Sequence, residues 1–281
     1  MFDLVSGAAD VTALLGAGSL TESLALTHGQ FGLFLTVVFL AGVVRGFTGF
    51  AQSALIMASL AVVIPPVSLI PVCYVLEGTA SLLLFRGGAR EADFRIVTGL
   101  AVGSAIGVPL GLQATLHLPA DASRLVALVL ILLLAALQLL GRRMSGVPPM
   151  AAGAKRWLAT PAGLCGAGLL AGVATGLAHV GGMIVALYVL ATNAPPARMR
   201  ASLVMFLFVG MFTSGVWLVS TDVLDRLALM RGLVLAPAVA AGVLIGARLF
   251  GPALQGIHRN FCLTLLIGLA LAGLVRQIVA G

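Results

Sequence analysis

Charged residues are scarce in this chain. Asp, Glu, Lys and Arg together make up 9% of its 281 residues, whereas a soluble globular domain carries about 25%. Hydrophobic residues make up 60%, and the mean hydropathy is +1.16. So few polar groups cannot cover a globular surface in water. We therefore expect an all-α membrane protein with the lipid bilayer as its surroundings.

Cysteine is also rare, and the sequence has no metal-binding pattern. Cys73, Cys165 and Cys262 are far apart and lie within apolar segments, without CxxC or His/Cys spacing. We interpret them as core residues and expect no metal and no cofactor. The net charge of +7 comes from Lys and Arg spread over short loops. Because a nucleic-acid-binding protein gathers such residues on one soluble face, we expect no nucleic-acid partner.

What the chain does contain is an internal repeat. Residues 41–66 read AGVVRGFTGFAQSALIMASLAVVIPP, and residues 171–196 read AGVATGLAHVGGMIVALYVLATNAPP. The two align without a gap, Ala-Gly-Val opens both and Pro-Pro closes both. In each copy a glycine-rich, polar stretch interrupts an apolar run. Matching interruptions in two halves of a membrane protein indicate a transport site.

Each interrupted segment is too long for one straight span. A helix over residues 31–64 would run roughly 50 Å, and the hydrocarbon core is about 30 Å thick. A break at residues 46–49 divides it into two arms of about 22 Å, neither of which spans comfortably. We predict a helical hairpin that enters and leaves on one side, or equivalently two short helices. Residues 161–193 repeat this pattern, with a break around residues 176–182.

The remaining apolar runs complete two repeats. The predicted spans are residues 67–85, 94–116, 123–140, 201–220, 227–250 and 260–279. Repeat 1 is then residues 31–140, a cytoplasmic linker is residues 141–160 and repeat 2 is residues 161–281. Residues 1–30 form a tail or contain a short interfacial helix over residues 20–27, since Ser19 and Glu22 have capping-box spacing.

Glycines spaced four residues apart predict close helix packing, within the chain or between the subunits of a homodimer. They are Gly99, Gly103, Gly107, Gly111, Gly242 and Gly246.

Loop charges predict the orientation. If both broken segments return to their starting side, most basic residues face one side, which is the cytoplasm. These are Arg86, Arg90, Arg95, Arg142, Arg143, Lys155, Arg156, Arg198, Arg200, Arg248 and Arg259. Only Arg124, Arg226, Arg231 and Arg276 lie opposite them. In the same arrangement one half enters the membrane from outside and the other from inside. The two halves are then inverted-topology repeats, as in many secondary transporters.

The order of these features resembles the sulfite exporter TauE/SafE family. In both halves an AGxxxGxxG-like glycine break precedes Pro-Pro and then a Gly-xxx-Gly helix, and the resemblance covers about residues 31–279. It implies a multi-pass protein of the bacterial inner membrane that moves sulfite or small organic anions such as sulfoacetate, usually outward. In the second half His179 replaces the expected glycine.

The residues beside the two breaks form the predicted substrate site. Each second arm begins at a break, where unpaired N–H groups and a positive helix end favour an anion. The predicted substrate-binding residues are Arg45, Gly46, Thr48, Gly49, Gln52, Ser53, Thr175, Gly176, His179, Gly181 and Gly182. We predict that Arg45→Ala weakens anion binding while leaving expression intact.

Several of these side chains have two interpretations. Arg45 binds the anion, pairs with Glu77 or faces water at a hairpin mouth. Glu77, the only acid in a predicted span, either carries a coupling proton or is a neutral or paired structural group. His179 either donates to the anion or is a satisfied core histidine. Short polar residues beside the breaks bind the anion or cap freed backbone.

Three function classes follow from these features. The first is a secondary transporter that exports a small anion, the second is an anion channel of the same architecture, and the third is an intramembrane enzyme. An enzyme needs a positioned base, nucleophile or metal set, and Glu77 is the only deep carboxylate. We therefore predict a transporter and no enzyme.

Overall fold

The fold is a bundle of helices that lie side by side. The computed structural model describes residues 24–61, 63–143, 157–191 and 195–249, and separate residues between 264 and 277. The longer helices of this part are α3 (His28–Thr48), α4 (Gln52–Leu60), α5 (Pro66–Glu91), α6 (Phe94–His117), α7 (Ala120–Arg143), α9 (Pro161–Ala178), α10 (Gly181–Ala191), α11 (Pro196–Ser220) and α12 (Arg226–Arg248). Seven of them are long and apolar enough to cross a membrane, and α4 and α10 are the two that are not. The prediction of an all-α membrane protein is confirmed.

The first repeat is interrupted as predicted, and the turn falls at the end of the predicted range of residues 46–49 and just beyond it. Helix α3 continues through Gly46 to Thr48, and the chain turns where Gly49 and Ala51 have φ values of 84° and 72°. With 21 residues, α3 is about 31 Å long, enough to span. The prediction of two equal 22 Å arms was therefore wrong, because Gly46 is held in helical conformation by close packing and the left-handed turn falls at Gly49.

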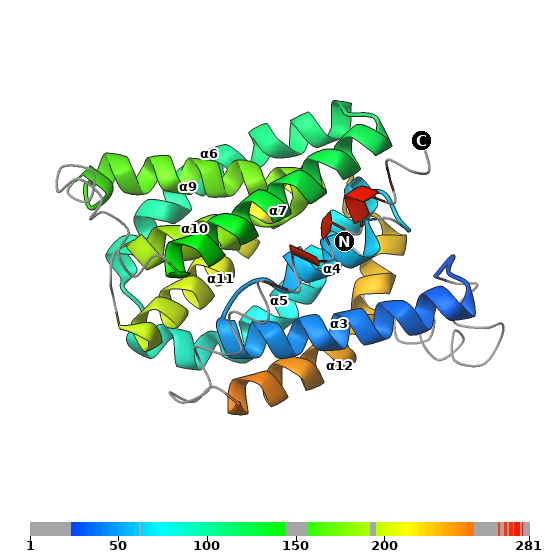
Figure 1. The fold of residues 1–281 in the computed structure, drawn as a ribbon, viewed down its shortest axis with the longest axis horizontal. Coiled ribbons are helices and arrows are strands. Elements are labelled where there is room, and N and C mark those ends of the chain that lie inside the picture. The colour runs from blue at the N-terminus through cyan, green and yellow to red at the C-terminus, as the bar shows by residue number, and fades with distance from the viewer. Residues whose placement is uncertain are drawn as a thin grey trace, which may run out of the picture.

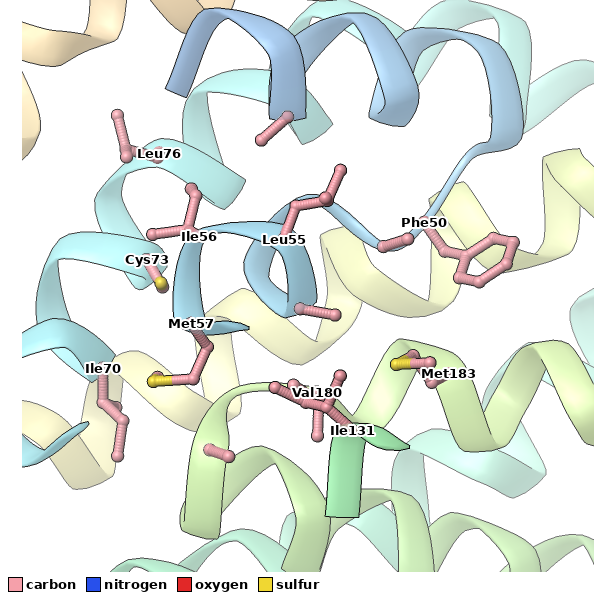
Figure 2. Packing of buried hydrophobic residues seen from close by; sticks show 14 of the residues in the cluster. Phe50, Leu55, Ile56, Met57, Ile70, Cys73, Leu76, Ile131, Val180 and Met183 are labelled. Carbon is pink, nitrogen blue, oxygen red and sulfur yellow. The ribbon is translucent and has the colours of Figure 1, made fainter. Parts of the chain in front are cut away.

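After this turn the chain reverses direction. Figure 2 shows α4 running back alongside the end of α3 after Phe50. Helix α4 is buried on nearly every side, as expected for a helix that is apolar all round. Its Ile56 and Met57 face Cys73 of α5, and Val180 of the second break lies nearby (Figure 2). The short helix therefore carries the first break into the centre of the bundle.

The second repeat is interrupted at two residues. Helix α9 ends at Ala178, His179 adopts a left-handed φ of 57°, and α10 begins at Gly181. Helix α10 packs back against α9. The break falls within the predicted range of residues 176–182, but Gly176 itself is still helical.

The most extensive helix contacts join the two repeats. Helix α6 packs along α9, and α12 packs along α3, and these pairs lie on opposite sides of α4 and α10 (Figure 1). Glycines line both contacts so closely that an added Cβ would overlap the partner's backbone. They are Gly103, Gly107, Gly111, Gly168, Gly172 and Gly176 in the first pair and Gly42, Gly46, Gly242 and Gly246 in the second. The predicted glycine packing is confirmed, and it serves contacts within the chain.

The corresponding helices α5 and α11 run antiparallel. Near the end of α5, Phe85 packs against Phe208 of α11 with 4.6 Å between ring centroids. Near the start of α5, Tyr74 lies against Gly215, farther along α11. Both helices begin with proline, at Pro66 and Pro196, where its fixed φ suits the first turn. The inverted relation of the complete repeats stays a prediction.

Parts of the predicted outer segments lie outside the described residues. Of the predicted interfacial helix over residues 20–27, residues 24–27 form a turn and an extended piece instead of helix. The capping box that the structure shows joins Thr27 and Gln30 at the start of α3. Most of the linker, at residues 144–156, and most of the last predicted span are outside the description. The domain boundaries therefore stay predictions.

Candidate functional site

The two breaks meet at one carboxylate, that of Glu77 near the middle of α5. Its Oε2 atom lies 2.9 Å from Nε2 of His179 and accepts a hydrogen bond from Ser53 Oγ at 3.2 Å. Its Oε1 atom lies 3.9 Å from Nη1 of Arg45. Arg45 and Ser53 flank the first break, and His179 is the second break. Residues that are far apart in sequence thus surround a single negative charge.

Arg45 is completely buried in the last turn of α3. Its guanidinium donates to the carbonyl of Gly49 through Nη1 and to Ser81 Oγ through Nη2, the latter at 3.0 Å. A buried charge needs such partners because it has lost its water. The interpretation that Arg45 faces water is wrong, since its exposed fraction is 0%. Arg45 closes the turn at Gly49 and also brings a positive charge toward Glu77.

Two further polar residues of the first break behave differently from each other. Thr48 uses its hydroxyl locally, donating to Val44 O at 2.8 Å and accepting from the Phe50 N–H at 3.2 Å. It therefore caps backbone freed by the turn. Gln52 is fully buried, and neither atom of its side-chain amide has a partner among the described residues. Because an unpaired buried amide is costly, Gln52 keeps unused hydrogen-bonding capacity at the start of α4.

The structure places Gly46 and Gly176 on the helix contacts described above, and their carbonyls are occupied. Arg200 donates through Nη2 to Gly46 O, and Thr115 Oγ1 lies 3.1 Å from Gly176 O. Thr115 was not among the predicted site residues, and Arg200 was expected in a cytoplasmic loop. Arg200 instead belongs to the first turns of α11. Its position shortly after Pro196 could have indicated this, because proline favours the first turn of a helix.

The second break borders a small cavity between α5, α6, α9, α10 and α11. Its polar lining consists of Tyr74, Glu77, Ser104, Thr175, His179 and Ser214, and Gly181 also lines it. Its volume of about 20 Å³, measured for the centre of a water-sized sphere, holds about one water molecule. A four-atom oxyanion therefore needs the surrounding helices to move before it fits.

Three of the lining residues were missed from the sequence. Tyr74, Ser104 and Ser214 are polar residues within otherwise apolar spans. A polar residue within an apolar span suggests a functional position, but the sequence does not show which face of each helix is turned inward. Thr175 was predicted, and its hydroxyl donates to Ala171 O at 2.9 Å in its own helix.

Two helix starts lie beside the Glu77 carboxylate. Ser53 is in the first turn of α4, and its hydroxyl contacts Glu77. Gly181 opens α10 and lines the same cavity as Glu77, and Gly182 follows it in this first turn. Since the first N–H groups of a helix lack intrahelical partners and its dipole is positive there, both starts favour negative charge at this place.

A multi-pass helical bundle with two interrupted segments that meet at buried polar groups has the architecture of a membrane transporter. The family described as sulfite exporter TauE/SafE matches residues 34–273. The chain belongs to that family, and the predicted resemblance is confirmed. No curated protein and no solved structure matches the chain.

Proposed function

We propose that this protein is a secondary transporter that carries a small oxyanion, sulfite or an organosulfonate such as sulfoacetate, out of the cell across the bacterial inner membrane. Its membership of a transporter family supports transport rather than catalysis. The observation that carries the proposal is that His179, Ser53 and Arg45 converge from both breaks on one buried carboxylate. A site that holds one oxyanion of its own chain has the donors to hold another.

The donor set fits an oxyanion. Hydroxyl, imidazole and guanidinium groups donate hydrogen bonds, and sulfonate or sulfite oxygens accept several at once. The amide of Gln52, unpartnered within the described part of the chain, supplies further donors. The starts of α4 and α10 add backbone N–H groups without adding a cation. An uncharged solute would leave these donors incompletely paired, which is a basis for selecting anions.

We assign the predicted site residues two kinds of role. Those that contact the substrate are Arg45, Gln52, Ser53 and His179 with the backbone at Gly181 and Gly182. Those that hold the breaks in shape are Gly46, Thr48, Gly49, Thr175 and Gly176. The second assignment follows from their contacts, since their hydroxyls or carbonyls bond to neighbouring backbone or side chains.

Outward transport agrees with the sign of the membrane potential. An inside-negative potential drives an anion outward by about 2.3 kcal/mol per charge per 100 mV. The small volume of the cavity beside Glu77 favours a carrier that changes conformation over a channel with a continuous path.

The test is efflux from liposomes that contain the purified protein and are loaded with sulfite, sulfoacetate or sucrose as the uncharged control. We expect saturable anion efflux, faster with the anion also present outside, and no sucrose efflux. Linear flux without this acceleration would indicate a channel. Absence of efflux for both anions under an imposed potential would refute the proposal.

A further inference from the structure

We infer that the Glu77 carboxylate is a tethered anion that occupies the substrate's place in the empty site, so that the substrate binds only as Glu77 gives up its donors and takes up a proton. This inference rests on the proposed function and states how the same site binds and releases its ligand. It makes Glu77 the residue that couples anion binding to proton binding.

Glu77 and the substrate compete for the same hydrogen-bond donors. Oε2 of Glu77 already takes the hydrogen bond from Ser53 and the contact from His179. These are groups that the proposed function assigns to the substrate. Two negative groups placed side by side in a buried site repel each other strongly, because water does not screen them. An ionised Glu77 and a bound oxyanion therefore exclude one another.

Charge balance in the buried site requires a proton. Among the described residues, the charged or titratable groups that face Glu77 from neighbouring elements are Arg45 from α3 and His179 from the second break. On its own helix, Cys73 and Tyr74 lie beside it. If a substrate takes over Arg45 and His179, an ionised Glu77 is left buried without a partner, which is strongly unfavourable. Uptake of one proton removes this cost, since the carboxyl becomes neutral.

The displaced side chain of Glu77 borders a polar cavity that can receive it. The side chain of Glu77 is 12% exposed, and the cavity that it lines also contains the hydroxyls of Ser104 and Ser214. Hydroxyl oxygens accept the O–H of a neutral carboxyl. The helix movement that the substrate requires also enlarges this cavity, so the carboxyl can turn toward Ser104 and Ser214 and release the hydrogen bond from Ser53.

Charges and protons balance in this exchange. The empty site holds a carboxylate, and the loaded site holds a neutral carboxyl, one substrate anion and one proton from solution. Sulfoacetate carries two negative charges, so its complex with one proton still carries one negative charge. An inside-negative potential therefore still favours its export.

The experiment measures binding of sulfoacetate to the full-length protein in lipid nanodiscs by calorimetry between pH 6 and pH 8. Both acidic groups of sulfoacetate stay ionised in this range, because carboxyl groups titrate near 4. Repeating each titration in buffers of different ionisation enthalpy counts the protons that are taken up. We expect about one proton per anion bound at the alkaline end, where the Kd rises by up to tenfold per pH unit.

Glu77→Gln is the decisive variant, because it keeps the shape of the side chain and removes its charge. We expect it to bind sulfoacetate at least tenfold more tightly than the unaltered protein at pH 8, without proton uptake. His179→Asn is the matched control, since asparagine tolerates the left-handed conformation at that position. It should bind more weakly and still take up the proton.

The outcomes separate the two proposals. If the unaltered protein binds sulfoacetate without proton uptake, or if proton uptake survives Glu77→Gln and disappears in His179→Asn, the tethered-anion inference is wrong while the proposed function stands. The proton count on the unaltered protein needs no variant to fold. If the folded protein binds neither sulfoacetate nor sulfite at any pH, the proposed function fails and the inference fails with it.

Discussion

Nε2 of His179 lies 2.9 Å from Oε2 of Glu77, and this contact ties the break of the second repeat to the long helix α5 of the first. Ser53, at the start of α4, donates to the same oxygen. The side chains of His179 and Glu77 are largely buried, with exposed fractions of 5% and 12%. The relative positions of the two breaks therefore depend on a polar contact that lipid and water scarcely reach.

Replacement of Arg45 tests whether it acts in both structure and binding. Because Arg45 bonds to Gly49 O and Ser81 and lies near Glu77, Arg45→Ala leaves buried groups unpaired. We expect a loss of about 3 kcal/mol in the free energy of unfolding together with loss of transport. This revises the prediction from the sequence that expression stays intact. Arg45→Lys keeps the positive charge and so separates the structural role of Arg45 from its role in binding. An unchanged melting temperature and unchanged transport in Arg45→Ala would contradict both roles.

The turn between α3 and α4 offers a stabilising substitution. Ala51 has a φ of 72°, a conformation that costs a residue with a Cβ roughly 1–2 kcal/mol. Glycine pays no such cost, although it loses more conformational freedom on folding. We expect Ala51→Gly to raise the melting temperature in a fluorescence melt. Ala58→Gly, inside α4, is the control and should lower it; a lower melting temperature for Ala51→Gly would show that the turn does not strain Ala51.

Thr115 connects the end of α9 to α6 through its hydroxyl. The hydroxyl lies 3.1 Å from both Gly111 O and Gly176 O and 3.2 Å from Leu177 O. Thr115→Val removes this donor from a buried place, so we expect a loss of about 1 kcal/mol. Thr98 is exposed and bonds to Phe94 O in its own helix, which makes Thr98→Val the matched control. Equal melting temperatures for the two variants would mean that the hydroxyl of Thr115 adds no stability.

Close packing between α6 and α9 predicts the effect of single methyl groups. A Cβ on Gly107 would overlap the Leu169 carbonyl of α9, and a Cβ on Gly87 would meet nothing within 4 Å. Gly107→Ala should therefore lower stability by about 1–3 kcal/mol, with loss of monodisperse protein on size exclusion. Gly87→Ala should be neutral or stabilising by up to about 1 kcal/mol, since alanine favours helix. Normal folding of both variants would indicate that the two helices are not in close contact.

The membrane class, the two interruptions and the glycine contacts can be predicted from composition and residue spacing alone. The composition indicates that the protein lies in a membrane, because a chain with 9% charged residues cannot face water on all sides. Residues such as Gly103 and Gly107 mark one helix face, because a spacing of four residues brings side chains to the same side. An arginine inside an apolar run, Arg45, likewise identifies a position that is costly unless it has partners.

The exact positions of the breaks, and the residues that meet there, depend on the packing of the helices. Gly46 has the freedom to break a helix, yet packing against α12 keeps it helical and the turn falls at Gly49. No sequence pattern joins His179 to Glu77, because periodicity relates residues along one helix and not between helices. Which groups meet depends on how far each helix is rotated and how deep each break lies, and these are set by the packing of the whole bundle.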